Sequence, residues 1–244
     1  MIRSVLAGLL LVSTASGAYA ADVPVMTYHE FPPFVTEQGK GLTYALADYM
    51  TKKSGGKYTF VVEAMPRKRL DTALAEGKAV VVPWATPAFF GDQDQTKYKW
   101  SATLIQDANA VVSPKAAPVE YAGPESLSGK TLGGVAGHRY GPVDALVDGG
   151  KVKRDDANSE LTNLKKAAQA RIDVTILADT AARYLIKSEN LADKLHVSAT
   201  PHSKYERRLF VAGPDAELAG FIAKTVEGMA SDADWKAISE PYLK

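Results

Sequence analysis

The tripeptide Arg67-Lys68-Arg69 is a candidate for binding an anion. It follows an expected strand over residues 58–62, at the start of an expected helix. A guanidinium can bind a carboxylate through two parallel hydrogen bonds, whereas an ammonium is a flexible point charge. Adjacent cations also occur on ordinary solvated surfaces. The sequence therefore leaves two interpretations of Arg67 and Arg69: a carboxylate-binding site or an exposed charged face.

The segment Gly137-His138-Arg139-Tyr140 offers a second place for an anion. It lies between an expected strand over 131–135 and an expected helix. Backbone N–H groups point outward at such a junction, and the helix dipole favours negative charge there. Arg139 either adds its own charge to this site or covers the start of the helix. His138 and Tyr140 are further candidates for contact with a ligand.

Aromatic residues follow two other expected strands. Tyr28, Phe31 and Phe34 lie in a loop that two adjacent prolines stiffen, and Trp84 follows the apolar segment 80–83. Such side chains offer a ligand an apolar wall, and their π faces attract an ammonium group. The alternative is that they fill the core or cap the sheet. We therefore treat all four as candidate ligand contacts.

The elements that must position these residues alternate between strand and helix. Expected strands cover 23–28, 58–62, 79–82, 108–112, 131–135, 172–177 and 209–212, and expected helices cover 42–50, 69–75, 161–168, 180–187, 218–229 and 234–242. This order predicts two α/β units, each with a mostly parallel sheet flanked by helices, joined by a proline-bearing linker over 113–118. Ligands of open α/β sheets bind beyond the carboxyl ends of the strands.

The first twenty residues are typical of a cleavable secretory signal peptide. A positive start at Arg3 precedes an apolar segment over 5–12, and Ala18-Tyr19-Ala20 is a small-x-small cleavage site. The alternative, a membrane anchor, needs about 20 apolar residues, which is more than this segment has. The chain has no cysteine and so cannot be acylated as a lipoprotein. We expect a protein released into the Gram-negative periplasm.

Charge and composition restrict the partners. Of 29 basic residues only Arg3 lies in the expected signal, so the remainder balances 28 acidic residues and is neutral overall. Neutrality argues against nucleic acid or an anionic membrane surface as the main partner. The four histidines show no metal-ligand spacing, so we expect no metal site and no cofactor. Small molecules or proteins therefore remain as the expected partners. We also expect the protein to be monomeric.

Several segments together resemble the extracellular solute-binding proteins of family 3, the periplasmic receptors of polar amino-acid ABC transporters. The likeness extends over essentially the whole chain after the signal. It is carried by the segments YHEFPPF (28–34) with a following G-x-G-L, MPRKRLDTALAEGKA (65–79), YKWSATLIQDANAVVS (98–113), LSGKTLGGVAGHRYG (127–141) and LTNLKKAAQARIDVTILADTAARYLI (161–186).

The resemblance implies a two-lobed periplasmic-binding-protein fold of type II with a two-strand hinge. A first lobe would cover 21–110 and receive the returning segment 201–244, and a second lobe would cover 111–200. The crossovers would lie near 107–115 and 199–206. The ligand would be an amino acid or a related organic acid or amine, held between the lobes, and the partner an inner-membrane ABC permease.

The resemblance also assigns roles to single residues. Arg69 matches a conserved family arginine, and Asp179 matches an aspartate that pairs with the amino group of the ligand. Asp179 is alternatively the N-cap of the helix expected from Thr180. Many family members bind the carboxylate with a T-x-x-R arginine, but here Thr86 is followed by Phe89 at that position. Either Arg69 or Arg139 replaces this arginine, or the ligand is not an ordinary α-amino acid.

Three functions fit these expectations. The first is a receptor without catalytic activity that delivers a solute to a transporter. The second is a sensory or accessory protein that binds ligand and then docks on another periplasmic partner. The third is an enzyme on the same fold, because some relatives are dehydratases, and it requires an acid or base near the reacting group. Glu30 and His138 are the loop residues that could serve, but they form no evident pair.

Overall fold

The computed structural model describes residues 20–243 of the 244-residue chain. The signal peptide expected over 1–20 lies, apart from Ala20, outside the described residues. Within residues 20–243, none of the helices combines the length and apolar character that crossing a bilayer requires.

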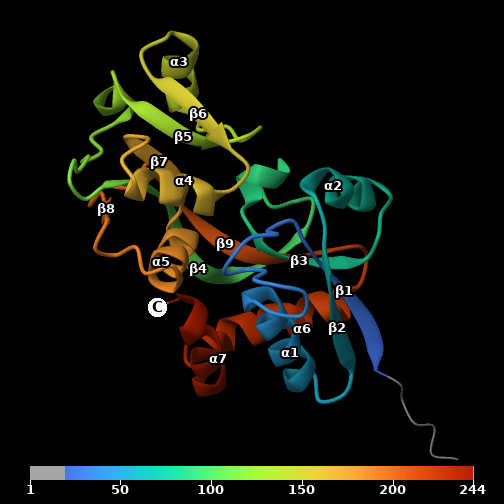
Figure 1. Ribbon diagram of the computed structural model, residues 1–244. Coiled ribbons are helices and arrows are strands. Elements are labelled where there is room, and N and C mark those ends of the chain that lie inside the picture. Colours follow the sequence, from blue (N-terminus) through green and yellow to red (C-terminus); the bar gives the residue numbers. More distant parts are fainter. Residues whose placement is uncertain (1–19, 244) are drawn as a thin grey trace, which may run out of the picture.

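The described chain alternates strands and helices much as the sequence predicts (Figure 1). The strands are β1 (Ala21–Thr27), β2 (Tyr58–Ala64), β3 (Val80–Ala85), β4 (Lys99–Pro114), β5 (Thr131–Val135), β6 (Lys153–Ala157), β7 (Val174–Ala178), β8 (Leu195–Val197) and β9 (Ser203–Ala212). The α-helices are α1 (Leu42–Lys53), α2 (Arg67–Ala75), α3 (Pro142–Asp148), α4 (Glu160–Ala168), α5 (Asp179–Ser188), α6 (Ala216–Met229) and α7 (Ala233–Leu243), and 3-10 turns cover Pro87–Phe90 and Pro124–Leu127.

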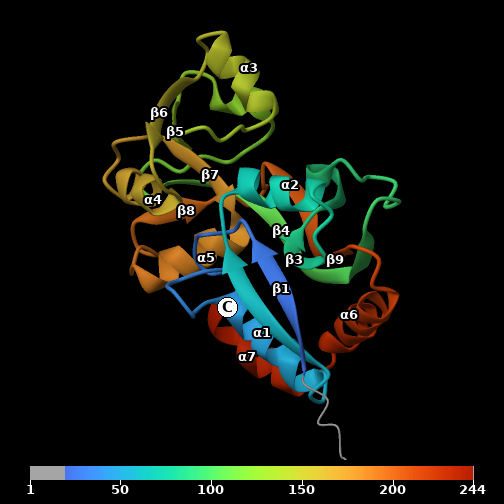
Figure 2. The same cartoon turned by 90° about the vertical axis from the view of Figure 1, so that its right-hand side faces the viewer.

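The strands form two parallel groups connected by two long strands. Their order is β2-β1-β3-β9-β4-β7-β5-β6, with β8 beside β4. Strand β1 is parallel to β2 and β3, and β5 is parallel to β6 and β7, while β4 and β9 are antiparallel to each other. Lobe 1 thus contains β1–β3 and lobe 2 contains β5–β7, with β4 and β9 running through both (Figure 2). The predicted two-lobed α/β fold with a two-strand hinge is confirmed.

Strand β4 is longer than the sequence predicts. It begins at Lys99 and ends at Pro114, so the expected linker over 113–118 starts inside the strand. Its first half alternates irregularly between buried and exposed residues and pairs with β9 through two shifts of register. That irregularity hides the usual strand period of two from sequence inspection. The division into lobes at residues 110 and 200 remains a prediction.

Each lobe has a core on both faces of its sheet. In lobe 1, α1 and α6 cover one face around Leu46 and Ile222, and α2 covers the other around Leu70. In lobe 2, α3 packs through Val143 against Leu132 of β5, while α4 and α5 pack on the opposite face. The last helix, α7, contacts α1 of lobe 1 and α5 of lobe 2.

Gly41 fixes the loop that carries the first aromatic candidates. Its φ of 122° is rarely open to other residues, and an added Cβ would lie 2.5 Å from the carbonyl oxygen of Phe34. This close approach lets Leu42 and Thr43 donate backbone hydrogen bonds to the carbonyls of Pro33 and Phe34. The start of α1 therefore holds the loop against the carboxyl end of β1.

Candidate functional site

The predicted site residues follow the carboxyl ends of strands in both lobes. Tyr28 follows β1, Arg67 follows β2, and Trp84 is the next-to-last residue of β3. In lobe 2, the loop over 136–141 follows β5, and Asp179 follows β7. In Figure 2 the arrows of β1 and β2 run toward lobe 2. Ligand sites of open α/β sheets lie at such ends.

Arg67 is the centre of an aromatic cluster in lobe 1. Its guanidinium carbon lies 4.0 Å from the ring centroid of Phe90 and 5.0 Å from that of Tyr28. Its Nη2 donates to the carbonyl oxygen of Phe89 at 2.6 Å, and its Nε donates to Oδ1 of Asp71 at 2.8 Å. About a third of its side chain, 35%, stays exposed. The guanidinium is thus oriented and still accessible to a ligand.

Tyr28 adds a polar group to the surroundings of Arg67, and Phe89 adds an apolar one. Burial raises the pKa of the Tyr28 hydroxyl, against the opposing charges of Arg207 and Arg67, so Tyr28 remains a hydrogen-bond donor. Phe89 is 51% exposed, and its ring lies 5.8 Å from that of Tyr205. Phe89 stands at the place of the arginine that the family resemblance would require. Because Arg67 donates to the carbonyl oxygen of Phe89, its guanidinium lies next to the position where the family arginine would stand.

The other candidates in lobe 1 are either buried behind the Arg67 cluster or lie away from it. Phe34 and Trp84 are fully buried in the core, and the Trp84 indole donates to Oγ1 of Thr43. Phe31 is half-buried and packs edge-on against Phe34. Arg69 is exposed on α2, two residues beyond Arg67. The structure therefore brings Arg67 into the cluster and leaves Arg69 outside it.

In lobe 2, Arg154 shapes the loop over 136–141. Its Nη2 donates to the carbonyls of Val135 and His138, and its Nε pairs with Asp156 at 2.7 Å. No local pattern in the sequence points to Arg154, because only the pairing of β6 with β5 places it beside the loop. Together with Arg139, it borders a hollow of about 450 Å³.

The three loop candidates differ in their exposure. His138 is exposed, and the Arg139 side chain is 75% exposed while its Nε lies 3.3 Å from Oδ2 of buried Asp144. Tyr140 is buried, and its hydroxyl accepts a hydrogen bond from the backbone of Val135. Tyr140 therefore supports the loop, whereas His138 and Arg139 can reach a ligand.

Asp179 begins α5 at the end of β7. The N-cap of this helix is Ala178, so the structure does not give Asp179 the alternative role of N-cap. Its Oδ2 accepts from Nε of Arg183 one turn later at 2.7 Å, and its side chain is 25% exposed. A carboxylate in this position can accept further hydrogen bonds from an ammonium group.

A buried polar cluster connects the crossover strands β4 and β9 to lobe 1, and of its residues only Trp84 is a candidate from the sequence. We name it the hinge cluster: His29, Trp84, Asp107, Tyr205 and Arg207. Arg207 on β9 donates from Nε to Oδ2 of Asp107 on β4 at 2.5 Å, and from Nη2 to the Tyr205 hydroxyl at 3.0 Å. Its Nη1 lies 2.8 Å from Nε2 of His29. An acid and a base separated by 100 positions give no local signal in a sequence.

His29 is neutral inside the hinge cluster. Burial, followed by the charges of Arg207 and Arg67, holds the pKa of His29 well below its ordinary value. Its Nε2 can therefore accept a hydrogen bond from Arg207, which places the proton on Nδ1. That atom is buried without a hydrogen-bond partner among the described residues.

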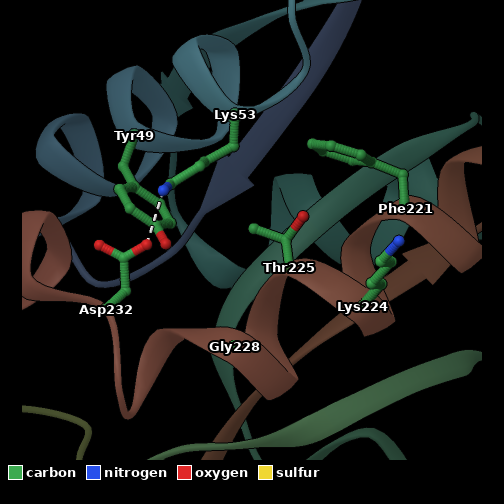
Figure 3. A pocket seen from close by; sticks show the side chains of 7 residues that line it. All are labelled: Tyr49, Lys53, Phe221, Lys224, Thr225, Gly228 and Asp232. Atoms are coloured by element: carbon green, nitrogen blue, oxygen red, sulfur yellow. Dashed lines mark ion pairs between the residues drawn. The ribbon is translucent and has the colours of Figure 1, made fainter.

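A second hollow, of about 320 Å³, lies on the outer face of lobe 1 between α1 and α6 (Figure 3). Lys53 lies in it, 2.6 Å from Oδ2 of Asp232 on the segment before α7. The Tyr49 ring stands beside the pair, and burial together with Asp232 raises the pKa of Tyr49 to about 12. These contacts join α1 to the C-terminal segment, so we assign them to stability.

Replacement of Asp232 with asparagine should lower the melting temperature at pH 7 by a few degrees. Hydrogen bonds from Lys53 and from the backbone of Trp235 hold the pKa of Asp232 well below its ordinary value. A depressed carboxyl pKa stabilises the folded state above the unfolded pKa, near 4, and this contribution is lost as the pH falls. The difference between variant and wild type should therefore narrow below about pH 4 in thermal unfolding followed by circular dichroism.

Asp234→Asn is the matched control, because Asp234 pairs with Lys52 at 3.1 Å through side chains that are 53% and 71% exposed. It should change the melting temperature less. An equal loss for Asp232→Asn at pH 7 and pH 3 would contradict the assignment.

Residues 20–243 contain no group of three or more His, Asp or Glu side chains placed to hold a metal ion. No protein-family model and no curated protein sequence matches the chain. Solved structures do match over nearly the whole chain.

An ancestral arginine-binding protein bound to arginine is 20% identical, with a TM-score of 0.70 over 93% of this chain and 100% of that protein. The substrate-binding protein of an amino-acid ABC transporter is 18% identical, with a TM-score of 0.65 over 91% and 99%. The ancestral amino-acid-binding protein AncCDT-1, a precursor of cyclohexadienyl dehydratase, is 17% identical, with a TM-score of 0.66 over 92% and 95%. These likenesses establish the two-lobed periplasmic-binding-protein fold, and the matching proteins include binding proteins and a precursor of an enzyme.

Proposed function

We propose that this chain is a periplasmic receptor that binds a small amino-acid-like solute between its lobes and delivers it to an ABC transporter of the inner membrane. Its lobes would correspond to residues 21–110 with 201–244, and to residues 111–200. The proposed ligand contacts are Tyr28, Arg67, Phe89, His138, Arg139 and Asp179. Ligand contacts from both lobes would favour the closed arrangement.

The observation that carries the proposal is that a guanidinium and a carboxylate, one in each lobe, follow the carboxyl ends of strands. Lobe 1 offers the Arg67 guanidinium, held between two rings and bonded to the carbonyl of Phe89. Lobe 2 offers the Asp179 carboxylate. A zwitterion with a carboxylate and an ammonium group matches this pair. Two solved structures with the same fold support the same ligand class: an arginine-binding protein bound to arginine and the substrate-binding protein of an amino-acid ABC transporter.

The proposal is tested by thermal unfolding with single compounds. L-arginine, L-glutamine, L-glutamate, putrescine, succinate and lactate would each be added in excess to the chain without its expected signal. A ligand that binds only the folded state raises the melting temperature, by an amount that grows with its concentration. We expect a shift with at least one amino acid and none with lactate. A panel in which no amino acid shifts the midpoint would overturn the proposed ligand class.

The alternatives predict other outcomes for compounds that bind. Conversion of a cyclic hydroxy acid to a new product would indicate a dehydratase. A ligand that binds tightly but does not promote uptake through a neighbouring permease would indicate a sensory protein.

A further inference from the structure

A buried ion pair connects the two crossover strands. Arg207 lies on β9 and Asp107 on β4, and their side chains are only 4% and 1% exposed. The bond between Nε and Oδ2 is 2.5 Å long. Removing two charges from water costs several kcal/mol each, so such a pair adds little net stability, but it demands a defined geometry.

Asp107 extends the pair to lobe 2. Its Oδ1 accepts from the backbone N–H of Thr180 at 3.2 Å and from that of Ala108 at 2.8 Å. Thr180 lies in the first turn of α5, where N–H groups have no partner inside the helix. The neighbouring residue is Asp179, the proposed ammonium contact. The carboxylate of Asp107 therefore holds the end of the helix that presents Asp179.

Arg207 extends the pair to lobe 1. Its Nη1 donates to the carbonyl of Trp84 at 3.2 Å and lies 2.8 Å from Nε2 of His29. Its guanidinium carbon lies 4.7 Å from the ring centroid of Phe34. Trp84 has a φ of 61°, a conformation that costs about 1–3 kcal/mol outside glycine and occurs at ligand sites. The pair is therefore anchored in the core directly behind the Arg67 cluster.

We propose that Asp107 and Arg207 are positioning residues that set the angle between the lobes in the ligand-free protein, and so the placement of Asp179 relative to Arg67. Any rotation that draws α5 away from β9 would leave a buried charge or donor unpaired, at a large cost. The pair thus restricts the hinge to arrangements that keep its hydrogen bonds. The placement of the lobes does not depend on the proposed function, whereas its consequence for binding does.

Distances between spin labels on the two lobes test the proposal without a ligand. The described chain has no cysteine, so Ala75→Cys on α2 and Ala145→Cys on α3 provide exposed labelling sites in lobe 1 and lobe 2. We expect Asp107→Asn, which keeps the shape and removes the charge, to shift or broaden the distance distribution measured by pulsed electron paramagnetic resonance. The variant changes no residue of α7, the helix that also contacts both lobes.

The double variant Asp107→Leu with Arg207→Met keeps the test valid if single variants fold poorly. It removes both charges together and therefore leaves no unpaired buried ion. Glu206→Gln is the matched control, because this exposed carboxylate on β9 accepts hydrogen bonds from Thr103 and Gln106 of β4 and takes no part in the buried pair. We expect a shifted distribution for the double variant and an unchanged one for the control. A wild-type distribution in both Asp107→Asn and the folded double variant would overturn the proposal.

Addition of L-arginine to the same labelled proteins separates this inference from the proposed function. A shift caused by Asp107→Asn without ligand, combined with no response of any variant to L-arginine or the rest of the panel, would leave the positioning role intact and reject the receptor function. A wild-type distance in the variants, combined with normal closure on L-arginine, would reject the positioning role alone.

Discussion

Replacement of Arg207 with methionine is expected to lower the free energy of unfolding by about 3–5 kcal/mol. The substitution keeps much of the side-chain length but removes the guanidinium donors that bond Asp107, Tyr205 and the carbonyl of Trp84. Asp107 would then be a buried carboxylate with backbone N–H partners and no counter-charge, which is costly in a low-dielectric interior. Urea unfolding followed by tryptophan fluorescence measures the change.

Two comparisons separate the ion pair from general packing loss at β9. Arg208→Met removes a neighbouring arginine whose Nε bonds the carbonyl of Ser101 and whose Nη1 bonds exposed Gln95, and it should cost about 1–2 kcal/mol. The double variant Asp107→Leu with Arg207→Met should recover part of the stability that Arg207→Met loses, because no unpaired charge remains. A double variant less stable than Arg207→Met would show that the uncompensated charge is not the main cost.

The Arg207 pair also shows what a sequence cannot predict. The alternation of strands and helices predicts two α/β units, and the rule for their carboxyl ends leads to the loops that carry the candidate site residues. Asp107 and Arg207, however, meet only through the antiparallel register of β4 and β9, which contains two shifts. A shift of one residue would turn either side chain to the other face of the sheet. No local pattern fixes that register.

The two candidate arginines of α2 illustrate a smaller ambiguity. Residues two apart on a helix point about 200° away from each other, so Arg67 and Arg69 cannot both face the same site. Which one faces it depends on where α2 packs against lobe 1. In the structure the carbonyl of Phe89, 22 positions further along the chain, accepts from Arg67. The family resemblance favours Arg69, whereas contacts outside the helix place Arg67, and not Arg69, beside Tyr28 and Phe90.

Buried aromatic residues were equally ambiguous in the sequence. Phe34 and Phe31 lie three positions apart in one loop, yet the first is fully buried and the second half-buried. The close approach of Gly41 to Phe34 determines this, because it seats the loop on α1. The ends of the strands therefore indicate where candidate site residues lie, and tertiary contacts decide which of them are exposed and which are buried.

Replacement of Arg67 with alanine is expected to weaken binding of the most effective amino acid about ten- to hundredfold, the effect of losing a charge-assisted hydrogen bond of roughly 1.5–3 kcal/mol. The guanidinium is oriented by Phe90, Tyr28 and the carbonyl of Phe89, so little entropy is lost when it binds a carboxylate. Isothermal titration calorimetry with the compound that gives the largest thermal shift measures the change.

Arg69→Ala is the control for this prediction, since it removes the same charge from the same helix at an exposed position. If Arg67 binds the carboxylate through its oriented, planar guanidinium, Arg69→Ala leaves the affinity nearly unchanged. The affinity of Arg67→Lys should then lie between those of wild type and Arg67→Ala. Equal losses for both alanine variants would point to a general effect of positive charge, because long-range attraction depends on net charge rather than on geometry. A loss confined to Arg69→Ala would instead restore the assignment that the family resemblance implies, and the packing of α2 would then have to differ in the ligand-bound protein.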